Sequence, residues 1–127
     1  MAKILLVEDD EMNRDMLSRR LERKNYTVSL AVNGQEAVEK AAVELPDLIL
    51  MDMNMPEMDG LEATRLIKKN PTTAHIPVLV VSAHAMPSYV AKAKSFEGGC
   101  DDYDIKPVDI DRLTGKIEAL LNRKSLK

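Results

Sequence analysis

The sequence predicts an open α/β fold built around a parallel sheet. Short apolar segments alternate with longer segments of helical period along the whole chain, and this alternation is typical of strand–helix units that form parallel sheets. The length of 127 residues is that of one domain of ~100–200 residues. Hydrophobic residues make up 45% and charged residues 31% of the chain, as in ordinary globular proteins and unlike disordered ones.

Five apolar segments are predicted to form the strands. Three of them are continuously apolar, as expected of central strands that helices cover on both faces. The second segment alternates and is expected at an edge of the sheet, and the fifth has the weakest pattern. The predicted strands are residues 4–7, 27–31, 48–51, 78–81 and a segment around 103–105.

Five segments with helical period are predicted to form the helices. Asp10 is placed to cap the first helix, and Pro46 is expected to end the second. The predicted helices are residues 12–24, a segment from 34 to 45, 61–69, 87–97 and a segment that starts at 110. In the first helix we expect one apolar face, made by Met12, Met16, Leu17 and Leu21. Residues 1–122 are expected to form the domain, and residues 123–127 a short frayed tail.

Composition argues against several classes of protein. The formal net charge is −3, with only three tyrosines and one phenylalanine, whereas a nucleic-acid-binding domain is normally basic and stacks bases on aromatic side chains. Cys100 is the only cysteine, so no internal disulfide or thiolate zinc cluster is expected. Together with the lack of a signal peptide, this favours the cytoplasm. No apolar run approaches the ~20 residues that span a bilayer. We expect a stand-alone domain without an attached output module.

Polar side chains follow four of the five predicted strands. Glu8 and Asp9 come after the first strand, Asp52 after the third, Ser82 after the fourth and Lys106 after the fifth. In parallel α/β sheets the carboxyl ends of the strands share one edge, and ligands bind there. We therefore expect these carboxylates, the hydroxyl and the ammonium group to lie close together.

This set of groups is suited to phosphoryl transfer. Oxygen ligands without histidine or cysteine suit a hard ion such as Mg²⁺, which Glu8 and Asp9 would carry. A carboxylate such as Asp52 can act as the nucleophile, while Lys106 and Ser82 can contact phosphoryl oxygens. Taken singly, Glu8, Asp9 or Asp52 also fits a solvated strand end, Lys106 an ordinary surface lysine, and Ser82 says little. The inference therefore depends on the combination.

Four stretches around these polar residues form a recognisable pattern. They are Ile-Leu-Leu-Val-Glu-Asp-Asp at 4–10, Pro-Asp-Leu-Ile-Leu-Met-Asp-Met-Asn-Met-Pro-Glu-Met-Asp-Gly at 46–60, Ile-Pro-Val through Ser-Ala at 76–83, and Gly-Cys-Asp-Asp-Tyr-Asp-Ile-Lys-Pro at 99–107. Here the chain closely resembles the receiver domain of two-component response regulators, of the stand-alone chemotaxis or cell-cycle type. The resemblance implies a flavodoxin-like three-layer sandwich, with a five-stranded parallel sheet of order 2-1-3-4-5 and five helices.

The resemblance also implies roles for individual residues. Asp52 resembles the phosphoacceptor, and Lys106 the lysine that contacts the phosphoryl group. Ser82 and Tyr103 resemble the two switch residues. The Mg²⁺ ligands implied, which could also hold Mn²⁺, are Glu8, Asp9, Asp52 and Asn54. Asn54 and His84 occupy positions that can tune hydrolysis of the acyl phosphate, although His84 can equally be an ordinary loop residue.

The resemblance further implies the partners. The phosphodonor would be a sensor histidine kinase or a histidine phosphotransfer protein. The downstream target, which is unknown, would bind the face made by the fourth helix, fifth strand and fifth helix. No direct contact with nucleic acid and no membrane insertion are expected, and the chain would not be an enzyme beyond its own phosphotransfer and slow dephosphorylation. The stretch from Ser82 to Lys106 is slightly longer than usual in the family, which bears on the identity of the partner.

Two other functions remain open from the sequence. One is a constitutive interaction module of the same fold, which the presence of Asp9, Asp52 and Lys106 disfavours. The other is a metal-dependent hydrolase of phosphate esters, which the lack of an obvious cap domain or general acid disfavours. Neither GxGxxG nor GxxxxGK[ST] occurs, so a nucleotide-binding enzyme is weaker still. A phosphoacceptor would still have three possible roles, as an output switch, a relay intermediate or a phosphate sink.

Overall fold

One parallel sheet forms the centre of the protein. The computed structural model describes residues 2–52, 60–82, 100–106 and 108–125. Its strands are β1 (Lys3–Val7), β2 (Thr27–Ala31), β3 (Leu48–Asp52), β4 (Val78–Ser82) and β5 (Asp102–Ile105). They are ordered β2-β1-β3-β4-β5, and every neighbouring pair is parallel. The predicted sheet, its strand order and the edge position of the second strand are thereby confirmed.

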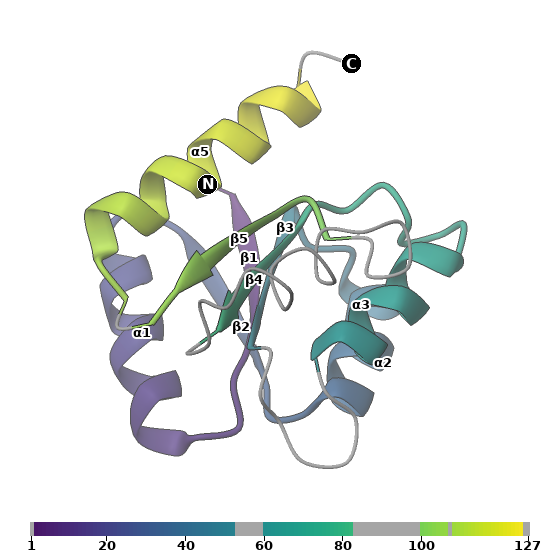
Figure 1. Ribbon diagram of the computed structural model, residues 1–127, viewed down its shortest axis with the longest axis horizontal. Helices are drawn as coiled ribbons and strands as arrows, with labels where there is room; N and C mark the ends of the chain where they lie inside the picture. Colours follow the sequence, from purple (N-terminus) through teal and green to yellow (C-terminus); the bar gives the residue numbers. More distant parts are fainter. Residues whose placement is uncertain (1, 53–59, 83–99, 107, 126–127) are drawn as a thin grey trace.

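Helices cover both faces of the sheet. They are α1 (Glu11–Arg23), α2 (Gly34–Glu44), α3 (Gly60–Lys69) and α5 (Ile110–Ser125). Figure 1 shows α1 and α5 on one face, with α2 and α3 on the other. The helix expected at residues 87–97 lies outside the described residues. The backbone of α5 continues to Ser125, three residues past the expected end of the domain.

Two apolar cores hold these layers together, one on each face of the sheet. Every residue of β3 and β4 is buried, because these central strands are covered on both sides. Alternate residues of a strand point to opposite faces, so Leu5 and Ile4 enter different cores. The core beneath α2 and α3 includes Leu5, Val7, Ala37, Ala41, Ile49, Met51, Ala63, Ile67 and Val80. The core beneath α1 and α5 includes Ile4, Leu6, Leu17, Leu21, Tyr26, Leu50, Val81, Leu113 and Ile117.

The apolar face of α1 is narrower than the sequence predicts. Leu21 is fully buried, whereas 81% of Met12 and 46% of Met16 are exposed. At 3.6 residues per turn, Met12 lies about 140° around the helix from Leu17, too far to share its contact with the sheet. The expectation that both methionines belong to the buried face was therefore wrong.

Local signals in the sequence set the helix boundaries. The Asp10 side chain accepts a hydrogen bond from the backbone N–H of Met12, which confirms the predicted N-cap of α1. Asn33 caps α2 in the same way through the N–H of Glu36, at 2.7 Å. The helix ends at Glu44, where Leu45 adopts a left-handed conformation with φ of 48° just ahead of Pro46, which cannot continue a helix.

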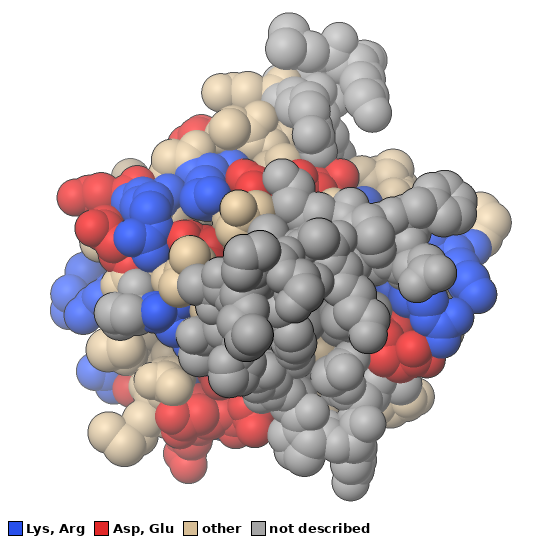
Figure 2. Space-filling model, viewed as in Figure 1, with Lys and Arg blue, Asp and Glu red and all other residues tan. Residues whose placement is uncertain are grey.

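Charged side chains of both signs share the surface. Figure 2 shows acidic and basic residues interspersed over the described part of the face in view, unlike the one-sided basic stripe that nucleic-acid-binding surfaces present. Among the residues that the structure describes, no helix combines the length and the apolar character that crossing a membrane requires.

Candidate functional site

The carboxyl edge of the sheet gathers the predicted polar residues. Asp52 is the last residue of β3 and Ser82 the last residue of β4, while Glu8 directly follows β1 and Lys106 directly follows β5. The backbone N–H of Lys106 donates to the carbonyl of Ser82 at 2.8 Å, so the sheet pairing continues to the start of the loop. The prediction that these groups share one edge is confirmed.

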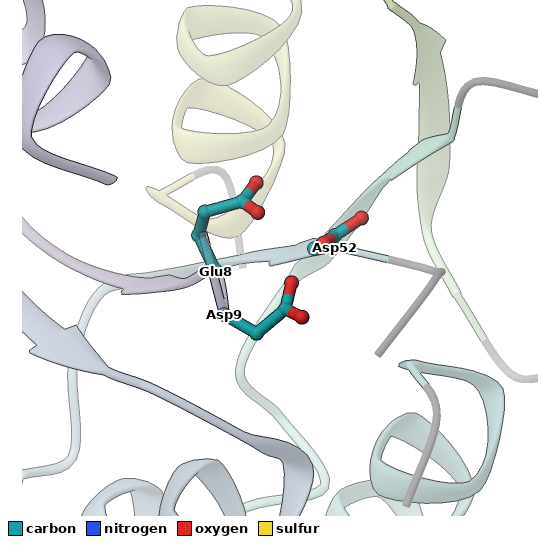
Figure 3. Close-up of side chains that lie close together, drawn as sticks. All are labelled: Glu8, Asp9 and Asp52. Atoms are coloured by element: carbon teal, nitrogen blue, oxygen red, sulfur yellow. The ribbon is translucent and has the colours of Figure 1, made fainter. Parts of the chain in front are cut away.

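Three carboxylates form a compact acidic cluster at this edge. Glu8, Asp9 and Asp52 each offer an oxygen, and these oxygens all lie within 4.8 Å of one another. Figure 3 shows the side chains entering a common space from the end of β1 and the end of β3. Only 4% of Glu8 and 3% of Asp52 are exposed, whereas Asp9 is exposed. Two buried acids and an exposed one, all oxygen donors, fit a hard divalent cation that keeps some of its water.

Lys106 partly compensates the negative charge of the cluster. Its Nζ atom lies 3.1 Å from Asp52 Oδ1 and 3.5 Å from Glu8 Oε2. The lysine side chain is 26% exposed, so it reaches the acids from the rim of the site. One ammonium group therefore faces two buried carboxylates.

The proton affinities reflect this excess of negative charge. Burial, followed by the charge of Asp52, raises the pKa of Glu8 to about 7. Burial lowers the pKa of Lys106, but the hydrogen bond and the charge of Asp52, with those of Glu8, outweigh it and raise the pKa overall. Near neutral pH Glu8 therefore retains a proton for part of the time, which a bound divalent cation would displace.

Arg14 holds the loop that presents Glu8 and Asp9. From the first turns of α1 its Nη1 atom donates to the carbonyl of Glu8 at 2.9 Å and to that of Asp9 at 3.4 Å. The backbone N–H of Asp10 donates to Glu8 Oε1 at 3.2 Å, which turns that carboxylate within the loop. The sequence prediction missed Arg14; its place one turn after the Asp10 cap is the signal that could have pointed to it.

A cavity of about 630 Å³ adjoins the site on the side of α1. Its walls include the apolar side chains of Leu17, Leu50 and Val81, and its lining also takes in Asp52 and Lys106. Asp52 is thus almost fully buried and borders this cavity.

Of the remaining predicted residues, the structure describes Ser82 and Tyr103. Ser82 is buried, with 7% exposed, at the strand end beside β3. Tyr103 lies on the edge strand β5, and the Lys116 Nζ atom is 5.3 Å from the centre of its ring. Asn54 and His84, expected as a metal ligand and as tuning residues, lie outside the described residues.

Known proteins resemble this chain in both sequence and fold. The chain is 37% identical over its full length to the response regulator ArlR of Staphylococcus saprophyticus and spans 56% of that protein. It is 36% identical over 118 residues to the polar-differentiation response regulator DivK of Brucella anthropi, covering 93% of this chain and 94% of DivK. The chain thus spans about half of ArlR, and as little as 27% of other relatives.

A solved structure of a receiver domain has a similar fold. The receiver domain of the sensor histidine kinase PA1611 from Pseudomonas aeruginosa, which has a magnesium ion coordinated in its active-site cleft, superposes with a TM-score of 0.86 at 30% identity. The match covers 95% of this chain and 98% of that one. A family model, that of the response regulator receiver domain, matches residues 4–118. The acidic edge of the sheet, the strand order and these matches together show that the chain belongs to the receiver-domain family of two-component response regulators.

Proposed function

We propose that this receiver domain is a phosphorylation-dependent switch in which Asp52 accepts a phosphoryl group from a phosphohistidine. The observation that carries the proposal is the approach of the Lys106 ammonium to Asp52, at 3.1 Å, within a cluster of three carboxylates whose oxygens lie within 4.8 Å. A carboxylate that can act as nucleophile, an ammonium group that compensates its charge and three oxygen donors suited to a divalent cation lie together there, and this arrangement supports the proposal.

The chemistry follows from these groups. An Asp52 oxygen attacks the phosphorus atom of the donor, the bond between phosphorus and the donor's imidazole nitrogen breaks, and that nitrogen keeps the electron pair and takes up a proton. Lys106 then contacts an oxygen of the transferred group, because an ammonium group is a suitable point charge for phosphate. When bound by Glu8, Asp9 and Asp52, Mg²⁺, or Mn²⁺ on the same oxygens, neutralises charge on the phosphoryl oxygens. Asn54 is the fourth proposed ligand.

The switch itself involves Ser82 and Tyr103. Ser82 ends β4, the strand next to that of Asp52, so its hydroxyl lies on the same edge of the sheet, and in the phosphorylated form it donates to a phosphoryl oxygen on Asp52. Tyr103 lies on the adjacent strand β5, where a change at Ser82 can alter its side-chain position. A two-state protein of this kind is biased by contacts that exist only in the phosphorylated form. Asn54 and His84 are proposed to tune hydrolysis.

The proposal includes the location, the partners and the output surface of the switch. Residues 1–122 form the signalling unit, which works in the cytoplasm with a sensor histidine kinase or histidine phosphotransfer protein. Its output is an interaction surface around β5 and α5, including the segment 87–97, and its only catalysis is its own phosphorylation and slow dephosphorylation. No nucleic acid and no membrane take part directly.

Labelling with a small phosphodonor tests the proposal. Wild type and Asp52→Asn are incubated with acetyl phosphate and Mg²⁺, and intact masses are measured. We expect a gain of ~80 Da in the wild type, lost when the metal is chelated, and no gain in the variant. Sustained release of phosphate from small phosphate esters, without a phosphorylated protein, would instead support a hydrolase.

A further inference from the structure

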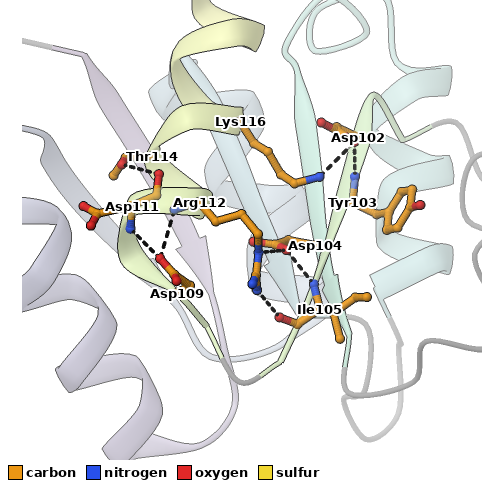
Figure 4. Close-up of polar contacts among 9 residues, drawn as sticks. All are labelled: Asp102, Tyr103, Asp104, Ile105, Asp109, Asp111, Arg112, Thr114 and Lys116. Atoms are coloured by element: carbon orange, nitrogen blue, oxygen red, sulfur yellow. Dashed lines mark hydrogen bonds and ion pairs between the residues drawn. The ribbon is translucent and has the colours of Figure 1, made fainter.

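The turn that carries Lys106 is held by an ion pair outside the acidic cluster. Asp104 lies on β5, two residues before Lys106, and only 3% of its side chain is exposed. The Nε atom of Arg112 donates to Asp104 Oδ1 at 2.8 Å, and its Nη2 atom donates to the carbonyl of Ile105 at 2.9 Å. Figure 4 shows the guanidinium between α5 and β5, in contact with both a side chain and the backbone.

Arg112 reaches across from a fixed position. It lies in the first turn of α5, where Asp109 Oδ1 accepts from the backbone N–H groups of Asp111 at 3.0 Å and of Arg112 at 3.1 Å. This is the geometry of an N-cap. Because the cap fixes the first turn of the helix, the backbone from which the Arg112 side chain extends is held in place.

The contacts continue without a break to the site. The backbone N–H of Ile105 donates to Asp104 Oδ1 at 2.8 Å, and the next N–H, that of Lys106, donates to Ser82 at 2.8 Å. Each peptide group just before the Lys106 side chain is thus tied either to the ion pair or to β4. The lysine stem has four flexible methylene groups, so the position of its Nζ atom depends on how firmly this backbone is held.

A purely structural role explains the buried carboxylate poorly. Within the described part of the chain, Asp104 Oδ2 is buried and has no hydrogen-bond partner. Asp104 pairs in register with the apolar Val81, where an apolar side chain would fit. Only the carboxylate of this pair is buried, since 46% of the Arg112 side chain is exposed. Burying a carboxylate costs hydration that an ion pair does not reliably restore, and an unsatisfied oxygen adds to that cost. What the pair provides, and an apolar pair would not, is directed hydrogen bonds to the backbone before Lys106.

We propose that Asp104 and Arg112 are a positioning pair that fixes Lys106 against Asp52. The role rests on the proposed function of the site, since it concerns the lysine that would contact the phosphoryl group. A displacement of about 1 Å in a reacting group can cost a factor of ~100 in rate. The same contacts tie α5 to the site, so the pair also places the start of that helix according to the position of Lys106.

A double apolar replacement separates positioning from stability. Asp104→Val combined with Arg112→Met removes the buried carboxylate together with its half-exposed partner, so no unpaired buried charge is left and we expect an unfolding midpoint in urea close to or above that of the wild type. We expect phosphorylation of the same protein by acetyl phosphate at saturating Mg²⁺ to be at least about tenfold slower. Arg112→Lys keeps the charge but lacks the two-armed contact of the guanidinium. Its phosphorylation rate should lie between those of the wild type and the double variant.

The matched control is another ion pair of α5. Lys24, the residue that caps the carboxyl end of α1, has its Nζ atom 3.3 Å from Asp111 Oδ1 of α5, and none of its contacts within the described part of the chain is with Lys106. Lys24→Gln should therefore leave the phosphorylation rate within about twofold of the wild type. A double variant that is stable and phosphorylated at the wild-type rate would overturn the positioning role.

A second readout does not depend on phosphorylation. In the metal-free protein the two Hε protons of Lys106, assigned with Lys106→Arg, should give distinct NMR shifts in the wild type because the side chain is held in one place. They should merge in the double variant. If the wild type accepts no phosphoryl group, the proposed function fails while this comparison still decides the positioning role; identical Lys106 spectra in both proteins would contradict it.

Discussion

The Nζ atom of Lys106 lies 3.1 Å from Oδ1 of Asp52, although 54 residues separate them in the sequence. The contact spans two strands that are not neighbours, since β4 lies between β3 and β5. It forms because both residues stand where their strands end, on the same edge of the sheet. The positive charge of Lys106 therefore compensates the Asp52 carboxylate from across the intervening strand.

Removing that charge should affect metal binding and phosphorylation in opposite directions. In Lys106→Met the carboxylates lose a positive charge that competes with the metal ion. Two unit charges 4 Å apart interact by about 1 kcal/mol even in water, and this is the energy by which we expect the competition to weaken Mg²⁺ binding in the wild type. Mg²⁺ should therefore bind about fivefold more tightly, as measured by titration calorimetry. Phosphorylation by acetyl phosphate should become about 100-fold slower, because a donor to the transferred group is lost.

Lys116→Met is the matched control for this variant. Lys116 is also a lysine beside β5, but its Nζ atom contacts Asp102 at 3.8 Å rather than the acidic cluster. Its replacement should leave the Kd for Mg²⁺ unchanged within error. Weaker Mg²⁺ binding in Lys106→Met would show that the lysine organises the metal ligands rather than competing with the ion.

The raised pKa of Glu8 predicts a pH dependence of stability. Its pKa is about 7 in the folded protein against an ordinary value of 4.5, so between these values the folded state holds a proton that the unfolded chain has released. The free energy of unfolding of the metal-free protein should therefore fall as the pH rises from 5 to 7, by up to about 3 kcal/mol from this group.

Comparison with Glu8→Gln isolates this contribution from those of other carboxylates. The variant should lack the decline in that pH window, as followed by urea unfolding at a series of pH values. Saturating Mg²⁺ should remove the decline from the wild type, because the ion binds the deprotonated form of Glu8. Equal slopes in wild type and variant without metal would show that Glu8 does not hold the proton.

Arg14 should support metal binding without touching the metal. Its guanidinium donates to the carbonyls of Glu8 and Asp9, and loss of such an outer contact typically weakens metal affinity by a factor of ~10 or more. Arg14→Gln should therefore raise the Kd for Mg²⁺ about tenfold. Arg19→Gln, which removes an exposed pair with Asp15 on the same helix, should leave it unchanged; equal effects of the two variants would point to net charge alone.

The corrected face of α1 predicts a sharp contrast in stability. Leu21 is fully buried, whereas Met12 is 81% exposed. Leu21→Ala should lower the free energy of unfolding by about 2–5 kcal/mol through lost burial and a cavity, while Met12→Ala should change it by less than about 0.5 kcal/mol. Urea titrations of both variants measure this, and a comparable loss from Met12→Ala would place that residue in the core after all.

The sequence predicts the fold and the main site for the same reason. Parallel strands alternate with helices, and their carboxyl ends meet at one edge, so the residues after each apolar run can be assigned to a common site without knowing any distance. Glu8, Asp9, Asp52, Ser82 and Lys106 all follow from this rule. The family resemblance adds their individual roles.

The contacts that hold the site could not be predicted in the same way. Arg14 and Arg112 act through long side chains that reach backbone carbonyls in other elements, and a linear pattern does not say where such a side chain ends. In the sequence, Asp104 is one more polar residue in the predicted strand with the weakest apolar pattern. Only the structure shows that it is buried beside an arginine of α5. The same limit explains Met12, since an apolar residue near a helical stripe need not lie on it.

Locating the phosphoryl group on the chain tests the central claim most directly. The wild type is treated with acetyl phosphate and Mg²⁺ and then with borohydride, which reduces an acyl phosphate to an alcohol, and the peptides are sequenced by mass spectrometry. Homoserine at position 52, absent when acetyl phosphate or Mg²⁺ is left out, is the predicted result. Homoserine at Asp9 or another acid in place of Asp52, or no modification under any of these conditions, would contradict it.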